Sequence, residues 1–313
     1  MPMQTVIGID IAKHHFDLHL LPSGKAKHFA NNTRGIRQCR RFVLGVQPDK
    51  IVLEATGGYE RALVMDLQAA HLPVIVVNPR RTRNYARAMG WLAKTDEIDA
   101  SVIAEFATSP RVVVRPLPDP KARKRQALIA RRDQLVQMHV AEQNHLEHAF
   151  DKDIVRSIRQ VLKTLERQID HIEKQVAELI EADETLQRHV TILCSTPGIG
   201  ETTAAMLVTQ LPELGHCNRR QIAALVGVAP LNRDSGQFQG KRMTGGGRRR
   251  VRTRLYMPTL VAIQHNPVIR AFYQRLLNQG KAKMTALVAA MRKLLTILNA
   301  MVATNELWNP NIA

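Results

Sequence analysis

The sequence contains few cysteines and few aromatic residues, and it lacks the usual motifs for binding a cofactor. Its three cysteines, Cys39, Cys194 and Cys217, are far apart and form no C-x-x-C pair. This excludes a disulfide framework and a zinc ribbon, and it fits a reducing cytoplasm. No P-loop, dinucleotide fingerprint or H-E-x-x-H motif occurs, so ATP, NAD and zinc are not implied. Aromatic residues make up only 4%, so base stacking is not expected to dominate nucleic-acid binding.

A long uncharged apolar run is also missing. The longest apolar stretch, 286–303, is interrupted by Arg292 and Lys293, and it falls short of a membrane span. Charged residues between Asp10 and Asp17 occupy the place where a secretory signal needs an apolar core. We therefore expect a bacterial cytoplasmic protein, associated with the nucleoid, with no membrane segment.

Acidic residues are too few to balance the basic ones. Lys and Arg number 45 against 27 Asp and Glu, which gives a formal charge of +18. Basic side chains gain free energy by displacing the counterions of phosphates, so the surplus predicts a polyanionic partner. A merely soluble basic surface is the alternative.

The first 115 residues alternate between apolar β-rich runs and a helical pattern, which predicts an α/β domain with a mixed sheet. The expected strands are 5–10, 16–21, 50–54 and 73–78, and a helix is expected over 59–70. Three prolines between positions 116 and 120 mark a linker. Residues 1–115 are therefore assigned to one domain.

Residues 116–190 form a linker and helices, and residues 191–313 form a mainly helical C-terminal domain. Between 154 and 179, apolar residues recur every three or four positions, which is typical of a coiled-coil helix. Residues 128–150 are its expected partner in an antiparallel hairpin, and a dimer-forming coiled coil also fits. At 196–206 a Pro-Gly-Ile-Gly turn precedes a helix, as in a helix-hairpin-helix motif, so Gly198 and Gly200 are candidate phosphate-binding residues.

Four carboxylates are placed where they could act together. Asp10 and Glu54 each end an expected strand, and Asp96 and Asp99 share one face of an expected helix. Clustered carboxylates repel one another unless a cation lies between them, and hard oxygen ligands suit Mg²⁺ or Mn²⁺. This arrangement is that of RNase H-like nucleases, in which two such ions hold the attacking and leaving oxygens of a phosphodiester. The alternative is that these acids are solvated strand ends, with Thr95 or Asp96 acting as a helix cap.

A second candidate site lies in 231–256. A glycine-rich turn there leads into an arginine-dense helix, which favours contact with a phosphate backbone over a solvated face. Its cations are Lys241, Arg242, Arg248, Arg249, Arg250, Arg252 and Arg254. Upstream, Ser235 lies in a polar loop with no histidine in the segment to act as its base, which disfavours a Ser-His-Asp hydrolase.

Taken together, these motifs resemble the DEDD transposases of the IS110 insertion-sequence family. The similarity covers nearly the whole chain and rests on Gly-Ile-Asp-Ile-Ala-Lys at 8–13, Glu-Ala-Thr-Gly-Gly-Tyr at 54–59, Asn-Pro at 78–79, Lys-Thr-Asp-x-x-Asp-Ala at 94–100, Pro-Gly-Ile-Gly at 197–200 and the Ser-Gly segment at 235. The match around Ser235 is looser than the match around the acids.

The resemblance implies an N-terminal RuvC-like domain of RNase H fold, whose metal ligands are Asp10, Glu54, Asp96 and Asp99. It also implies a C-terminal transposase domain in which Ser235 forms a covalent phosphoserine link with DNA, supported by Mg²⁺. Domains of different subunits would build a composite site, in a homodimer or homotetramer. A structured bridge RNA would pair with donor and target DNA.

The sequence thus predicts a metal-dependent DNA recombinase that excises and inserts a mobile element. Two alternatives stay open. One is a RuvC-like junction resolvase or nuclease, in which water attacks the phosphate. The other is a non-catalytic nucleic-acid scaffold, which explains the charge of +18 but gives the four carboxylates no role.

Overall fold

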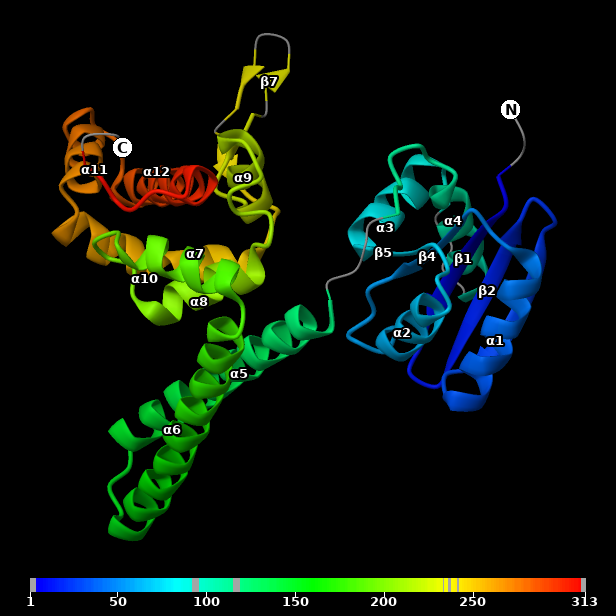
Figure 1. Ribbon diagram of the computed structural model, residues 1–313, viewed down its shortest axis with the longest axis horizontal. Coiled ribbons are helices and arrows are strands. Elements are labelled where there is room, and N and C mark those ends of the chain that lie inside the picture. Colours follow the sequence, from blue (N-terminus) through cyan, green and yellow to red (C-terminus); the bar gives the residue numbers. More distant parts are fainter. Residues whose placement is uncertain are drawn as a thin grey trace. The chain divides into compact units, whose positions relative to one another are not determined.

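The computed structural model describes residues 4–91, 96–114, 119–232, 234–235, 238–240 and 242–310, with the backbone alone described at 96–98, 234 and 238–239. The chain divides into two compact units, Met1–Leu117 and Pro118–Ala313 (Figure 1). The division into three segments at 115/116 and 190/191 stays a prediction.

The N-terminal unit contains a five-stranded mixed sheet of order β3-β2-β1-β4-β5. Strands β1 (Val6–Ile11), β2 (His15–Leu21) and β3 (Lys25–Ala30) pair in antiparallel fashion. Strands β4 (Lys50–Glu54) and β5 (Val74–Val77) extend the sheet in parallel from β1. The predicted α/β unit with a mixed sheet is confirmed, and its arrangement is consistent with the expected RNase H-like fold. The pattern missed β3, an exposed edge strand.

Helices cover both faces of this sheet. On the buried strands β1, β2 and β4, successive residues point alternately to the two faces. Ile7 and Ile9 of β1 pack with helices α1 (Thr33–Val46) and α2 (Arg61–Ala69). Val6 of β1 and Val52 of β4 pack on the opposite face with helix α4 (Asp96–Ala107). Helix α3 (Pro79–Ala88) joins this second face through Tyr85.

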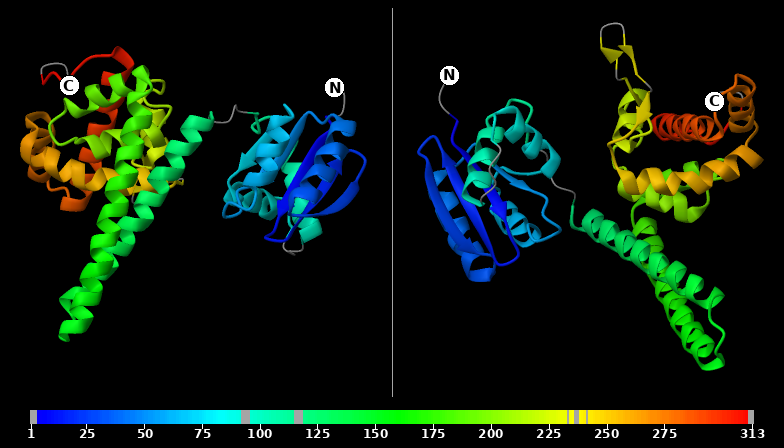
Figure 2. Two further views of the ribbon diagram at one scale, coloured as in Figure 1. Left: turned by 60° about the horizontal axis from the view of Figure 1, so that its bottom comes forward. Right: turned by 180° about the vertical axis from the view of Figure 1, so that it is seen from behind.

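In the C-terminal unit, helices α5 (Pro120–Glu147) and α6 (Lys152–Glu181) form an antiparallel hairpin. The ion pairs Arg132–Glu173 and His139–Glu166 show the antiparallel register. Figures 1 and 2 show the hairpin extending away from the other helices of its unit. The predicted apolar stripe is buried only near those helices, as at Ile172 and Val176.

The remaining helices share one core with the base of the hairpin. They are α7 (Glu184–Cys194), α8 (Glu201–Gln210), α9 (Arg219–Val226), α10 (Arg249–His265), α11 (Pro267–Asn278) and α12 (Lys283–Thr304). Between α9 and α10, two short ladders pair β6 (Pro230–Leu231) with β9 (Met243–Thr244), and β7 (Asp234–Ser235) with β8 (Phe238–Gln239). In the described part of the chain, α12 alone is long and apolar enough to span a membrane, but most of its apolar window is buried in this core.

Candidate active site

Helix α4 lies directly against the central strand of the N-terminal sheet. A Cβ atom at Gly8 would lie 2.3 Å from the Ala104 nitrogen and 2.4 Å from the Ala100 oxygen. The absence of a side chain at Gly8 therefore lets the two backbones touch, with small alanines on the helix side. This close approach fixes the height of α4 above the strand that carries Asp10.

The direction of α4 is shown by its C-terminal end. The Lys50 ammonium, at the start of β4, donates a hydrogen bond of 3.3 Å to the carbonyl oxygen of Ala107, the last residue of α4. Strands β1 and β4 run in parallel from this end. The first turn of α4, which carries Asp96 and Asp99, therefore points toward the carboxyl ends of β1 and β4. Asp10 and Glu54 lie at those ends.

Three carboxylates lie in a row across the sheet on the face that α4 covers. The β1–β4 register pairs Gly8 with Val52 and Ile9 with Leu53, so its next step brings Asp10 beside Glu54. On the other side, Asp10 pairs directly with Asp17 of β2. Directly paired residues project to the same face, so Asp17 belongs to this row. Sequence reasoning missed this role because strand alternation alone does not reveal which residues pair.

The Asp17 carboxylate has partners of its own. Asp17 Oδ1 lies 2.8 Å from Nδ1 of His28, and Oδ2 lies 3.9 Å from Nε2 of His15. A carboxylate opposite another carboxylate is destabilising unless other groups compensate its charge. His28 lies on β3, so its contact holds the Asp17 carboxylate on the side away from Asp10.

The Glu54 carboxylate is oriented by helix α3. The hydroxyl of Thr82, which is 2% exposed, donates a hydrogen bond to Glu54 Oε1. Helix α3 starts at the Asn-Pro pair: the Asn78 side chain accepts from the Arg80 amide at 2.9 Å, and Pro79 occupies the first turn. An Asn cap followed by proline is a strong helix start. The Asn-Pro motif thus positions the helix whose Thr82 holds Glu54.

The glycines after Glu54 close a tight turn. Gly57 and Gly58 have positive φ angles of 62° and 102°, which favour glycine. The Glu60 carboxylate accepts hydrogen bonds from the amides of Thr56 at 3.0 Å and Gly58 at 2.9 Å. These residues therefore shape the loop and leave Glu54 as the acid of this motif that faces α4.

The donor atoms of the four predicted metal ligands suit a divalent cation. Asp10, Glu54, Asp96 and Asp99 offer only carboxylate oxygens, which are the ligands that Mg²⁺ and Mn²⁺ prefer. Among the described residues, no three His, Cys, Asp or Glu side chains are grouped closely enough to hold one ion. The side chain of Asp96 lies outside that description. Asp10 and Asp99 are both engaged in interactions within the chain.

Ser235 lies in the C-terminal unit, in strand β7 of a short ladder rather than in an irregular loop. Figure 1 shows this ladder projecting from the helices of its unit. The residue is exposed, and within the described part of the chain its hydroxyl has no hydrogen-bond partner. No neighbouring base that would activate this serine is therefore seen among those residues.

The family is shown by two comparisons that together match most of the chain. A model of IS110-type DEDD transposases matches residues 7–154, and a model of the IS116/IS110/IS902 transposase family matches residues 190–274. These matches contain both the acids and the serine. The chain belongs to the IS110 family of transposases.

Curated relatives agree with this assignment. The transposase is 28% identical over 328 residues to the pilin gene-inverting protein of Moraxella bovis, covering 99% of both chains. It is 27% identical to the transposase of insertion element IS1328 from Yersinia enterocolitica, covering 75% of this chain and 77% of that protein. A solved RuvC from T. thermophilus, in complex with a Holliday junction, matches 37% of this chain at 16% identity, with a TM-score of only 0.27.

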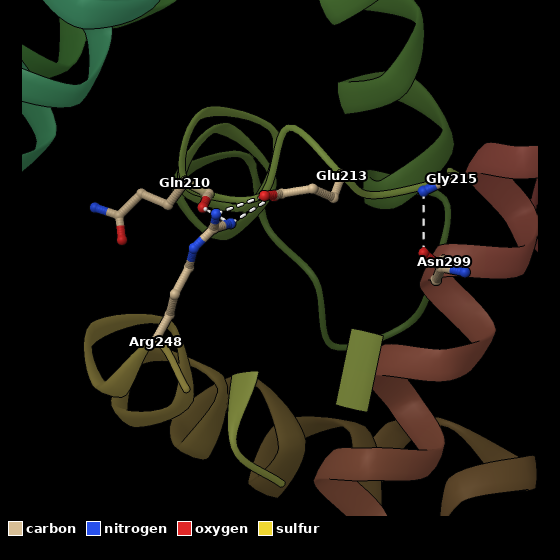
Figure 3. Close-up of polar contacts among 5 residues, drawn as sticks. All are labelled: Gln210, Glu213, Gly215, Arg248 and Asn299. Atoms are coloured by element: carbon tan, nitrogen blue, oxygen red, sulfur yellow. Dashed lines mark hydrogen bonds and ion pairs between the residues drawn. The ribbon is translucent and has the colours of Figure 1, made fainter. Parts of the chain in front are cut away.

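Several side chains of the arginine-dense segment form hydrogen bonds and ion pairs within the transposase itself. The Arg248 guanidinium donates two hydrogen bonds of 2.6 Å to the Glu213 carboxylate and one of 2.8 Å to the Gln210 carbonyl oxygen (Figure 3). Bidentate pairs of this kind are among the stronger ion pairs. Arg248 therefore joins the start of α10 to the end of α8, and this accounts for it without a phosphate.

Arg252 and Arg254 are also engaged. Arg252 Nη1 donates to the Gly246 carbonyl oxygen at 2.8 Å and to that of Gly227 at 3.3 Å, at the end of α9. Arg254 forms an ion pair with Asp133 of α5, and burial lowers the pKa of its guanidinium, with the nearby charge of Arg132 contributing. These three contacts explain both arginines structurally.

The other predicted phosphate ligands differ in their surroundings. A Cβ at Gly198 would lie 2.7 Å from the Ala262 nitrogen of α10, so this glycine serves internal packing. Gly200, in contrast, caps the open start of α8 with no atom near its Cβ position. Arg242, Arg249 and Arg250 are exposed. Lys241 lies outside the described residues. Phosphate binding by this set stays a prediction.

Proposed function

We propose that this transposase excises and inserts a mobile element by Mg²⁺-dependent cleavage and rejoining of DNA through a phosphoserine intermediate. One observation carries the proposal. Helix α4 is directed so that its first turn, with Asp96 and Asp99, faces the sheet edge that bears Asp10 and Glu54. In this proposal the four acids meet at that edge, where a divalent cation would compensate their mutual repulsion.

Asp10, Glu54, Asp96 and Asp99 would hold Mg²⁺, and Mn²⁺ could replace it. When bound, the ions stabilise the charge that develops on the phosphate during strand transfer. Thr82 keeps one oxygen of Glu54 oriented through its hydroxyl. Gly8 lets α4, which carries Asp96 and Asp99, lie close against β1, which carries Asp10.

Ser235 would act as the nucleophile. Its Oγ loses its proton and forms a bond to phosphorus while the ester bond to one deoxyribose oxygen breaks. That oxygen takes up a proton in exchange and leaves as a free hydroxyl. A new hydroxyl end then reverses the step and releases the serine. One phosphate ester replaces another throughout, so rejoining needs no ATP, in agreement with a sequence that has no P-loop.

We further propose that a structured bridge RNA, pairing with donor and target DNA, guides the reaction in a homodimer or homotetramer. The formal charge of +18 supports a nucleic-acid partner, since phosphate contacts supply most of the sequence-independent affinity. Purification from cells that carry the gene with its native flanking DNA tests the RNA. We expect one discrete RNA from the flank after DNase treatment. Heterogeneous RNA, or none, would contradict guidance.

The central experiment compares Asp10→Asn and Ser235→Ala on DNA carrying the native element ends. We expect Asp10→Asn to abolish strand cleavage while nucleic-acid binding is retained. Ser235→Ala should abolish the covalent protein–DNA adduct on denaturing gels. An adduct that survives in Ser235→Ala would show that this serine is not the nucleophile. Unchanged cleavage by Asp10→Asn would contradict the assignment of the metal site.

A junction nuclease in which water attacks the phosphate is the second candidate. The exposed Ser235 hydroxyl, without a partner in the described part of the chain, favours it. It uses the same acids but forms no adduct. Cleavage that persists in Ser235→Ala and still requires Asp10 would establish this alternative.

A further inference from the structure

The tip of the α5–α6 hairpin carries an aromatic ring that packs against nothing. Phe150, in the turn between the helices, is 97% exposed. Nearby on α6, Ile154 is 55% exposed. Single exposed apolar residues are common on soluble proteins, so the ring becomes informative only together with the groups beside it.

A row of basic residues lies beside this ring. Lys152, Arg156, Arg159 and Lys163 follow one another at spacings of four, three and four, so they share one face of α6. At 1.5 Å per residue this face is about 16 Å long. Arg156 pairs with Asp153 at 3.5 Å, but both side chains are mostly exposed, and such surface pairs contribute little.

The ring and the cations line an open, shallow hollow of about 440 Å³ on the surface of the hairpin tip. Val155 and Gln160 complete its lining, and no acidic residue takes part. This volume lies in the range of small-ligand sites. The hollow therefore combines a flat apolar surface with four positive charges, which is the pattern of a site that stacks a base and binds the adjoining phosphates.

We propose that the hairpin tip, defined as Phe150, Lys152, Arg156, Arg159 and Lys163, binds unpaired RNA, with one base stacked on Phe150 and its phosphates on the four cations. A base can reach the ring only when it is unpaired and unstacked, as in an RNA loop, whereas duplex DNA hides its base faces. The choice of RNA rests on the proposed function, in which a structured RNA takes part.

The test measures fluorescence anisotropy of a labelled 12-nucleotide oligouridine with the full-length protein, freed of nucleic acid. Phe150→Ala should weaken binding about 10-fold, in the range found for one stacked base. The matched control, Ile154→Ala, removes an exposed apolar side chain of the same tip that does not line the hollow. It should change affinity less than 2-fold.

A charge-matched pair tests the cations. Arg159→Gln with Lys163→Gln removes one arginine and one lysine from the hollow, and should reduce the slope of log affinity against log salt by about 1.4. Arg131→Gln with Lys124→Gln removes the same charges from exposed positions on α5. This control should leave the anisotropy curve nearly unchanged at the same salt concentration.

Because other basic surfaces also attract RNA, a 4-thiouridine 12-mer should be photocrosslinked and its sites mapped by mass spectrometry. We expect crosslinks on the tryptic peptide that contains Phe150, lost in Phe150→Ala. Crosslinks only elsewhere would overturn the proposal, as would equal effects of Phe150→Ala and Ile154→Ala. Tighter Phe150-dependent binding of oligothymidine would overturn the choice of RNA. Loss of subunit association in Phe150→Ala, seen by light scattering, would instead assign the tip to a second copy of the chain.

Oligouridine carries no sequence of the mobile element, so its binding tests the hairpin tip independently of the proposed function. The proposal for the tip can fail while the Ser235 adduct and the flank-derived RNA are both observed. Conversely, absence of that adduct leaves oligouridine binding to the tip untouched. Each proposal is therefore contradicted by its own measurement.

Discussion

Gly8 determines how closely α4 can lie against the central strand. Its hypothetical Cβ would overlap the backbone of α4, where no side chain can rotate away. We expect Gly8→Ala to destabilise the chain by about 3 kcal/mol, since overpacked sites relax only through backbone shifts. The shift should also move Asp99 away from Asp10, so cleavage should fall further than stability does. Urea unfolding and a strand-cleavage assay measure the two effects.

Gly45 provides the control for this substitution. It lies inside helix α1, is exposed, and has no atom within 4 Å of its Cβ position. Alanine should stabilise this helix by about 0.5–1 kcal/mol. Equal unfolding midpoints for Gly8→Ala and Gly45→Ala would show that α4 does not depend on the bare strand at Gly8.

At the level of single residues, the sequence indicated Asp10 and Glu54 because each follows buried strand residues. It could not indicate Asp17 or Thr82. Asp17 joins the row only through the antiparallel register of β2, and Thr82 reaches Glu54 from a helix 28 residues away. Such neighbours are set by pairing and packing, which alternation along one strand does not encode.

Between elements, the Arg248–Glu213 pair joins α10 to the segment that follows α8. Glu213→Gln leaves the guanidinium without its charged partner, and we expect unfolding to become easier by about 1–2 kcal/mol. Chemical denaturation of the full chain measures the change. Protease sensitivity near the start of α10 should rise with it.

The Arg156–Asp153 ion pair is the control for this prediction, because we expect it to contribute little to stability. Its side chains are 75% and 87% exposed, against 35% and 36% for Arg248 and Glu213. Asp153→Asn should therefore alter the free energy of unfolding by less than about 0.5 kcal/mol. If Glu213→Gln proves equally harmless, Arg248 is available for another partner, and its assignment to phosphate regains support.

Elements were easier to predict than their partners. The apolar repeat of α6 predicted a long helix, and Pro197 and the glycines after it indicated the turn before α8. The arginine-rich stretch of α10 was expected to face phosphate throughout. The structure instead gives Arg248 a carboxylate 35 residues earlier and gives Arg254 one 121 residues earlier. A local charge run cannot reveal partners so far away in the sequence.

For the whole molecule, the proposed acids belong to the N-terminal unit and Ser235 belongs to the C-terminal unit. If each active site combines acids of one subunit with the serine of another, a mixture of Asp10→Asn and Ser235→Ala chains contains sites with both parts intact. We expect such a mixture, refolded together, to regain partial cleavage of DNA carrying the native element ends. Neither variant should cleave by itself.

The control for this mixture is the double variant Asp10→Asn/Ser235→Ala combined with the same amount of Asp10→Asn chain. No site in that combination has intact acids, so cleavage should stay absent. A first mixture that stays inactive, although light scattering shows mixed oligomers, would place acids and serine in the same subunit.

The base of the segment that carries Ser235 has a consequence for how the gene can change. The Arg248 amide donates to the Leu225 carbonyl oxygen at 2.8 Å, and Arg252 bridges Gly227 and Gly246, so both ends of the segment are fastened to α9. The entropy of closing a loop grows only slowly with its length. Insertion or deletion of residues between these ends should therefore have little effect on folding. Each such change would, however, shift the position of Ser235. Selection for stability therefore does not constrain the length of this segment, and only selection for transposition keeps it constant. In elements that no longer transpose, we expect its length to vary.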